Sequence, residues 1–352
     1  MLLMKRLVIF MAAMCGLLTG AAAQTGILIK HANRDTAYIK DYYRKYFIVR
    51  AYESTKFNNF KYINGHDKLI YKPNDHNNFG LGFNYRFLCL NLGVYVPGAG
   101  KDKSTYGKTH YLDLQTHLYV HKFILDFYGQ FYRGYYLANS ESVISNLTTH
   151  IITRPDVSTR DITLELQYVF NDKRFSYNAP FYQNELQKQS AGSFLLGGGI
   201  YHFDARGDSA LTPSDVSYAN FFHNYRFNAS SNSGMGASGG YAYTLVIKKR
   251  FFITGILTGG LGVNEASLSN TLADQQQKKL GAVLNLSGKF AAGYNSDKYF
   301  AGVTYIRLVT EDNAVEPGAW QEVNTGNFRF TVAKRFRLKR NILPKSELIK
   351  IE

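Results

Sequence analysis

Strict alternation of apolar and polar side chains in residues 161–170 (DITLELQYVF) constrains the fold of this chain most strongly. Successive side chains of a β-strand point to opposite faces, so this stretch has one apolar face and one charged, hydrogen-bonding face. Val169 is the single apolar residue on the polar face. A half-buried strand of a soluble sheet shows the same pattern. A membrane barrel is therefore indicated only if the pattern recurs, at about ten residues per strand, behind an export signal.

Residues 1–23 have the three parts of a secretory signal peptide. Lys5 and Arg6 precede an apolar run over residues 7–18, and the small residues 21–23 form a cleavage site. The run is too short for a membrane-spanning helix. We expect the mature chain to begin near Gln24, with residues 24–43 as a periplasmic lead-in.

The composition suits a barrel. The chain holds 27 Tyr, 25 Phe and 31 Gly but only 7 Pro, and its mean hydropathy is −0.24. Past the signal peptide no apolar run approaches the ~20 residues that a membrane helix needs. Alternation keeps the average hydropathy of a membrane barrel low, so these values agree with a membrane protein built from strands.

The formal net charge is +15. Such an excess of basic residues would ordinarily suggest nucleic acid as a partner, but a protein exported from the cytoplasm does not encounter nucleic acid there. The expected partners are outer-membrane lipid and the phosphates of lipopolysaccharide. The alternative is that Lys and Arg only form basic rims at the two membrane interfaces.

The alternation recurs along the rest of the chain. The expected strands are 45–54, 78–85, 88–96, 109–120, 123–136, 161–170, 194–205, 236–247, 250–263, 280–294, 298–310 and 325–338. Tight connections alternate with long polar segments at 55–77, 97–108 and 137–159. This pattern predicts an all-β protein, a transmembrane antiparallel up-and-down β-barrel over residues 44–338 with short periplasmic turns and long extracellular loops. About twelve strands are expected, with fourteen as the alternative, and 339–352 as a basic periplasmic tail.

Residues 174–193 do not fit this scheme. If all tight turns lie on the same side of the membrane, strands 161–170 and 236–247 cross the membrane in the same direction. Successive strands alternate in direction, so an odd number of membrane-crossing strands must lie between these two. Strand 194–205 supplies one crossing, and the segment 174–193 carries Pro180 and loses the alternation. We expect a periplasmic excursion or a plug in the lumen. Its candidate polar residues are Gln183, Glu185, Gln187, Lys188, Ser190 and Ser193.

Three stretches carry a resemblance to a known family: NFGLGFNYRFLCLNLGVYVP, KTHYLDLQTHLYVHKFILDFYGQFYRGYYL and RFSYNAPFYQNELQKQSAGSFLLGG. They resemble an uncharacterised (domain-of-unknown-function) family of exported outer-membrane β-barrel proteins of Gram-negative bacteria, over nearly the whole mature chain. The resemblance implies the fold and the bacterial outer membrane as location, and it transfers no active site. The chain continues past the last strand through KRNILPKSELIKIE, so the barrel-assembly machinery, an expected partner, meets a last strand that is not terminal.

No catalytic motif occurs, and neither a metal site nor a cofactor is expected from the nine His residues. Ser190 or Ser193 with His202 and Glu185 is the one grouping that could serve a lipid-acting hydrolase.

The inner face is expected to carry both signs of charge, from Asp113, Asp126, Glu165, Arg50, Arg133, Arg329 and Arg335. These side chains either fill a small barrel as a ladder of ion pairs or line a narrow path for a small polar or anionic solute. The expected function is a narrow or plugged conduit, or a binding barrel for a small polar or hydrophobic ligand. A hydrolase and a structural or adhesive barrel are the alternatives.

Overall fold

The computed structural model describes residues 34–42, 46–74, 76–85, 88–120, 122–144, 151–213, 222, 225–270, 273–313, 315–316 and 318–338. The predicted signal peptide, 1–23, and the predicted tail, 339–352, lie outside these residues. The strands are β1 (Ile39–Asp41), β2 (Tyr46–Asn64), β3 (Asp67–Pro73), β4 (His76–Tyr85), β5 (Leu88–Gly100), β6 (His110–Val120), β7 (Phe123–Leu137), β8 (Ile152–Val169), β9 (Glu185–Gln187), β10 (Ala191–Arg206), β11 (Ala229–Ile247), β12 (Phe251–Asn270), β13 (Gln275–Asn295), β14 (Tyr299–Asn313) and β15 (Ala319–Arg337). The helices are α2 (Lys103–Tyr106), α3 (Ser140–Val143) and α4 (Asn178–Phe181). In this part of the chain, none of the helices has the length and apolar character needed to cross a membrane.

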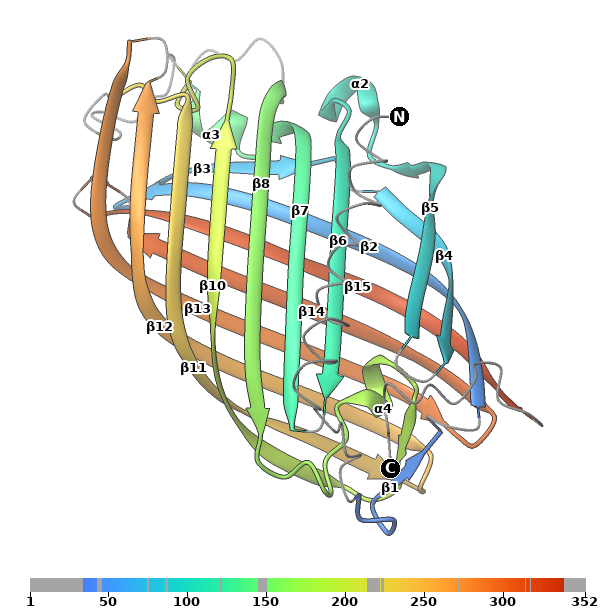
Figure 1. Ribbon diagram of the computed structural model, residues 1–352. Helices are drawn as coiled ribbons and strands as arrows, with labels where there is room; N and C mark the ends of the chain where they lie inside the picture. Colours follow the sequence, from blue (N-terminus) through green and yellow to red (C-terminus); the bar gives the residue numbers. More distant parts are fainter. Residues whose placement is uncertain are drawn as a thin grey trace, which may run out of the picture.

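Ten strands form a closed antiparallel barrel in the order β2, β3, β7, β8, β10, β11, β12, β13, β14, β15, and β15 pairs with β2 to complete the ring (Figure 1). Three further strands of the same sheet lie outside this ring: β4 pairs with β2, β5 with β4, and β6 with β7. The remaining two strands, β1 and β9, form a separate two-stranded sheet. The short β3 pairs with β2 through residues 67–71 and with β7 through residues 71–73. The prediction of an all-β antiparallel barrel is confirmed, whereas the closed ring itself has ten strands.

The wall strands are longer than the sequence pattern predicted. β8 has 18 residues, β12 has 20 and β13 has 21, against the ~10 that cross a bilayer. The predicted loop 55–77 was wrong, because it contains the second half of β2 and all of β3. Likewise, β8 begins inside the predicted loop 137–159. Backbone pairing continues wherever a neighbouring strand is present, even after the outward side chains turn polar and the apolar alternation ends.

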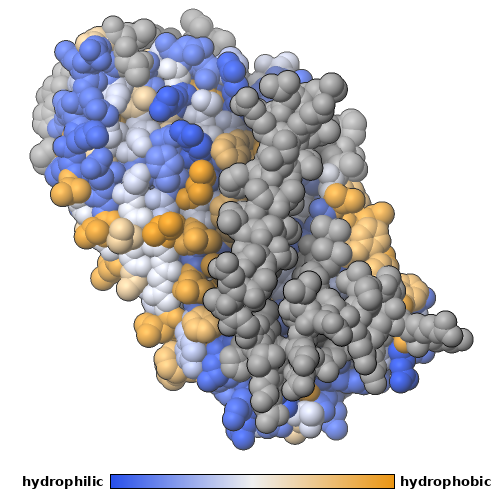
Figure 2. Space-filling model, viewed as in Figure 1, coloured by the Kyte–Doolittle hydropathy of each residue, from blue (hydrophilic) through white to orange (hydrophobic). Residues whose placement is uncertain are grey.

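The outward face carries a belt of exposed apolar side chains. On β8, Ile162, Leu164 and Leu166 are exposed, while Asp161 and Thr163 are buried, so the alternation has the predicted sense. Figure 2 shows apolar residues across the middle of one face, with polar residues on either side. A water-soluble monomer rarely exposes so large an apolar surface. Further exposed members of the belt are Phe194, Leu196, Ile200, Met235, Phe251, Ile253, Leu257, Leu261, Val263, Phe328, Phe330 and Val332.

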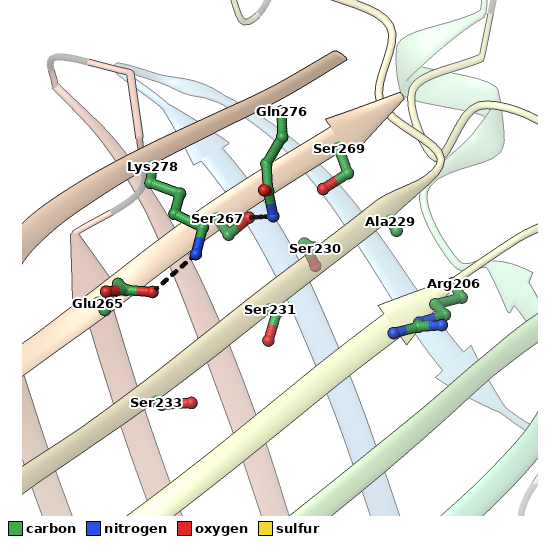
Figure 3. Close-up of a pocket in the computed structure, with 10 residues that line it drawn as sticks. All are labelled: Arg206, Ala229, Ser230, Ser231, Ser233, Glu265, Ser267, Ser269, Gln276 and Lys278. Carbon is green, nitrogen blue, oxygen red and sulfur yellow. Dashed lines mark hydrogen bonds and ion pairs between the residues drawn. The ribbon is translucent and has the colours of Figure 1, made fainter. Parts of the chain in front are cut away.

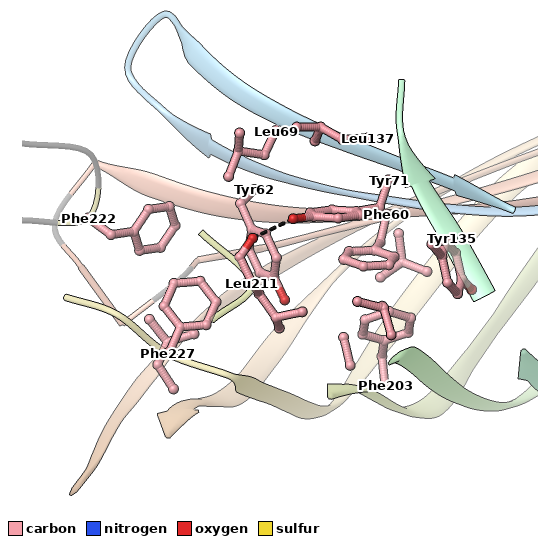
Figure 4. Packing of buried hydrophobic residues seen from close by; sticks show 14 of the residues in the cluster. Phe60, Tyr62, Leu69, Tyr71, Tyr135, Leu137, Phe203, Leu211, Phe222 and Phe227 are labelled. Carbon is pink, nitrogen blue, oxygen red and sulfur yellow. Dashed lines mark hydrogen bonds between the residues drawn. The ribbon is translucent and has the colours of Figure 1, made fainter. Parts of the chain in front are cut away.

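The two ends of the barrel differ. Tight connections, such as residues 248–250 between β11 and β12 and 296–298 between β13 and β14, gather at what we call the turn end, where β1 and α4 also lie (Figure 1). The longer connections, including α2 and α3, lie at the loop end. An aromatic cluster fills the barrel near the loop end (Figure 4). In this cluster the ring of Phe60 stacks on Tyr71 at 4.8 Å and packs edge-on to Tyr135 at 5.2 Å.

Candidate functional site in the barrel lumen

The plug segment, residues 174–193, folds against the turn end of the barrel. Its strand β9 pairs with β1, which belongs to the predicted lead-in, and Lys188 N donates to Tyr38 O at 2.7 Å. Phe175 and Tyr177 are buried among wall residues such as Ile124 and Ile256. Apolar burial and backbone pairing with β1 therefore hold residues 174–190. Residues 191–193 of the predicted segment are instead the first residues of wall strand β10.

Gln183 connects the plug segment to two arginines of the wall. Its backbone has a φ of 61°, an uncommon conformation for a side-chain-bearing residue. The Gln183 carbonyl accepts from Arg335 Nε at 2.9 Å and Nη2 at 2.7 Å, and Gln183 Oε1 accepts from Arg50 Nη1 at 3.1 Å. All three residues are buried. Arg335 also donates to Asn295 Oδ1 at 2.9 Å and lies over the ring of Tyr42. Charged donors make these the stronger kind of hydrogen bond.

Glu185 and Gln187 lie on β9 and are also buried. The Glu185 carboxylate pairs with Arg34 at 3.0 Å and accepts from the Ser176 hydroxyl. Gln187 Oε1 accepts from Ser176 N at 2.8 Å, and Gln187 Nε2 donates to Arg174 O at 2.6 Å. These side-chain contacts stay within the plug segment and its lead-in. The Glu185 carbonyl also accepts from Asn295 Nδ2 of β13 at 3.3 Å, so Glu185 attaches the plug to the wall as well as shaping it.

The remaining candidates of the plug segment have other positions. Lys188 is half-buried and faces a hollow at the turn end that also contains Lys40 and Asp297. Ser190 Oγ accepts from Val246 N at 2.9 Å, and Ser193 Oγ accepts from Asn171 N at 2.9 Å. Both hydroxyls therefore satisfy backbone groups where β10 begins.

A buried ion pair crosses the lumen beside the plug segment. Lys289 of β13 donates to the Asp126 carboxylate of β7, and Lys289 Nζ also lies 3.2 Å from Tyr177 Oη. In the ten-strand ring, four strands separate β7 from β13 in either direction, so the pair joins opposite walls. Glu165 is directly opposite Asp126 in the β7–β8 register. The lumen is thus bridged at the level of Tyr177.

Nearer the loop end, other side chains bridge the lumen. Asn232 Nδ2 donates to Gln321 Oε1 at 3.0 Å, and Tyr62 Oη is 2.6 Å from Ser230 Oγ. A cavity between Asp161 and Asp312 measures about 10 Å³, roughly the room for one water. The lumen is filled by side chains at several levels.

Two more candidates lie on the inner side of the wall. Asp113 pairs with Lys56 at 2.8 Å, and Arg329 lies over the ring of Tyr52 at 4.7 Å. Arg133, in contrast, is exposed on the outward face, so its predicted inward position was wrong. The bulge of β7 follows Arg133, at Gly134 with a φ of 92°, and therefore leaves Arg133 in phase with the outward Phe131.

The structure does not bring together the hydrolase grouping considered from sequence. Glu185 lies in the plug segment at the turn end, whereas His202 lies nine residues beyond Ser193 on β10, about 30 Å along the strand. In the described ranges no cluster of three or more His, Cys, Asp or Glu side chains is arranged to hold a metal ion.

Sequence reasoning missed Lys289. It stands in the run LSGKFAAGY, at an inward position of a strand whose outward neighbours are Gly288 and Phe290. A lone charge at an inward position is the signal that could have identified it, because such a charge needs a partner inside the barrel.

Residues 33–336 match the family described as "Domain of unknown function (DUF4421)". The chain belongs to this family. No curated protein sequence matches the chain significantly.

Solved structures of three bacterial proteins resemble this barrel distantly. The outer membrane protease OmpT from Escherichia coli has a TM-score of 0.35 and 10% identity, covering 83% of this chain and 97% of OmpT. CdiB from Acinetobacter baumannii has a TM-score of 0.29 and 10% identity, covering 81% of this chain and 60% of CdiB. The toluene transporter TodX from Pseudomonas putida has a TM-score of 0.26 and 7% identity, covering 88% of this chain and 100% of TodX. At these values no function is transferred from any of them.

Proposed function

We propose that this DUF4421 protein is an outer-membrane β-barrel that works as a plugged conduit for a small polar solute, closed at rest by residues 174–193. The apolar belt on the outward face supports the membrane location, because a lipid phase is the natural partner of a belt that encircles a closed barrel. The turn end then faces the periplasm and the loop end the exterior, as in barrels of this class.

The observation that carries the closed state is the contact of Lys289 with both Asp126 and Tyr177. A side chain of the plug segment and two side chains of opposite walls meet at one buried point, so no solute passes there without moving Tyr177. The inner face at this level is polar, with Glu165 and Gln167 beside the pair. A polar solute fits such a lining better than an apolar one.

We further infer that the belt-level wall contains twelve strands. β4 and β5 extend the wall from β2, and β6 extends it from β7, while β3 touches only the loop-end parts of β2 and β7. At the level of the belt the order is therefore β6, β7, β8, β10, β11, β12, β13, β14, β15, β2, β4, β5. β9 pairs with β1 and adds no crossing, which does not favour fourteen strands.

Conductance across a planar bilayer tests the closed state. The full chain is expected to give no stable single-channel steps, and deletion of residues 177–189, which removes Tyr177 and Gln183 together, is expected to give steps from a barrel that still assembles. The matched control removes residues 140–142 of α3, at the loop end and away from the plug segment. Stable steps from the intact chain would contradict the proposal, as would a silent deletion variant that retains the heat-modifiable gel migration of a folded barrel.

A further inference from the structure

A hydroxyl, an imidazole and a carboxylate form a chain of hydrogen bonds on the outward face. His202 of β10 and Ser233 of β11 are directly opposite in the register of the two strands. His202 Nδ1 lies 2.7 Å from Ser233 Oγ, and His202 Nε2 lies 3.1 Å from Asp204 Oδ2. Asp204 follows His202 by two residues and so shares its face.

The Asp204 carboxylate is fixed from the other side by Arg160. These two residues face each other across β8 and β10, and Arg160 Nε donates to Asp204 Oδ2 at 2.9 Å. A neighbouring guanidinium favours the ionised carboxylate. An ionised Asp204 accepts from His202 Nε2, which leaves Nδ1 as the acceptor for the Ser233 hydroxyl. This tautomer makes His202 a general base toward Ser233.

Ser233, His202 and Asp204 lie at the loop-end edge of the apolar belt. At the next outward position toward the turn end, the three strands β8, β10 and β11 carry Leu164, Ile200 and Met235, and the neighbouring β12 carries Val263. All four side chains are exposed. One position toward the loop end, β8 carries Arg160, β11 Ser231 and β13 Lys278. In a membrane this edge coincides with the interface, where the headgroups and ester bonds of lipids lie.

A polar hollow of about 210 Å³ opens beside Ser233. Figure 3 shows Ser231, Ser233 and Ser267 along its floor, with Lys278 reaching toward Glu265 at 3.4 Å. Arg206 contributes a second cation at its rim. With two cations against the one carboxylate of Glu265, the lining has a net positive charge, which suits a ligand that carries an anionic headgroup.

We propose that Ser233, His202 and Asp204 hydrolyse an acyl ester of an anionic lipid in the outer leaflet. Ser233 Oγ bonds to the ester carbonyl carbon while its proton passes to His202 Nδ1. The ester C–O bond breaks, and His202 returns the proton to the leaving alkoxide. Water from the exterior then attacks the acyl-serine with His202 as base, releasing a fatty acid and restoring Ser233. Asp204 and Arg160 position the imidazole. This activity is independent of the plug.

The test uses the full chain in mixed micelles, with dioleoyl phosphatidylglycerol and p-nitrophenyl palmitate as substrates and a fluorophosphonate probe for reactive serine. Wild type is expected to hydrolyse both substrates and to be labelled. Ser233→Ala should lose labelling and at least about 100-fold of the hydrolysis rate. Ser142→Ala, an exposed serine on α3, is the control and should retain both.

Asp204→Asn separates positioning from a purely structural role. It is expected to lower kcat with KM unchanged, because an amide can donate as well as accept and so no longer fixes the imidazole tautomer as the carboxylate does. Wild type without hydrolysis or labelling, in a folded barrel, overturns the proposal, and so does equal activity of Ser233→Ala. The conductance of Ser233→Ala should equal that of wild type, so failure here leaves the plugged conduit untouched.

Discussion

Lys289 of β13 donates a hydrogen bond to Asp126 of β7 across the full width of the lumen. The two residues are separated by 163 positions in the chain, and both are buried. An ion pair in this position ties opposite walls together and contacts the plug segment through Tyr177.

Lys289→Met is expected to destabilise the barrel by about 3–5 kcal/mol, because it leaves the Asp126 carboxylate buried without its cation. Urea unfolding of the protein in lipid vesicles measures this loss. The double variant Lys289→Met, Asp126→Leu should recover most of it, and Lys334→Met, on the outward side of β15, is the matched single control. Equal stability of Lys289→Met and wild type would show that the pair does not hold the walls together.

Arg335→Ala is expected to loosen the plug segment. It removes the two hydrogen bonds to the Gln183 carbonyl, a loss of about 2–3 kcal/mol of docking free energy. The fraction of barrels in which the plug segment is displaced should rise roughly 30- to 150-fold. Intermittent openings in single-channel recordings measure this rise. Arg337→Ala removes an exposed arginine two residues along the same strand and should stay silent. A silent Arg335→Ala variant would mean that other contacts suffice to hold the plug.

The topology predicts which positions are reachable from outside a cell. In a Cys89→Ser background, cysteine at Ser104 or Ser142, on the loop-end helices α2 and α3, should react with an impermeant maleimide on whole cells. Cysteine at Asp297, exposed in the turn between β13 and β14, should react only after lysis. The reverse labelling pattern would show that the barrel has the opposite orientation in the membrane.

Arg206→Ala combined with Lys278→Ala is expected to remove the preference for anionic lipid. The two cations flank the hollow beside Ser233, so wild type should hydrolyse phosphatidylglycerol faster than phosphatidylcholine by about tenfold, the worth of one or two exposed charge contacts. The double variant should treat both lipids alike. Comparing initial rates on vesicles of each lipid makes this measurement, and an unchanged preference would place lipid selection elsewhere.

Alternation in the sequence was sufficient to determine the faces of many strands. It placed Ile162 and Leu164 outward, and Asp126 and Arg335 inward, because a period of two is a local property of an extended backbone. The odd crossing count likewise set residues 174–193 apart from the wall. Arg133 was placed on the wrong face, since only the structure shows that the bulge at Gly134 comes after it.

The partners of these side chains were decided by the tertiary structure alone. The two-residue alternation determines which face of a strand a residue occupies. It does not determine which strand lies beside it or in what register the two strands pair. Lys289 meets Asp126 because the ring closes with β7 and β13 on opposite sides, and Ser233 meets His202 because β10 and β11 pair in one register of several. Strand length also depended on neighbours, since backbone hydrogen bonding extends β2 and β13 through segments that carry no apolar pattern.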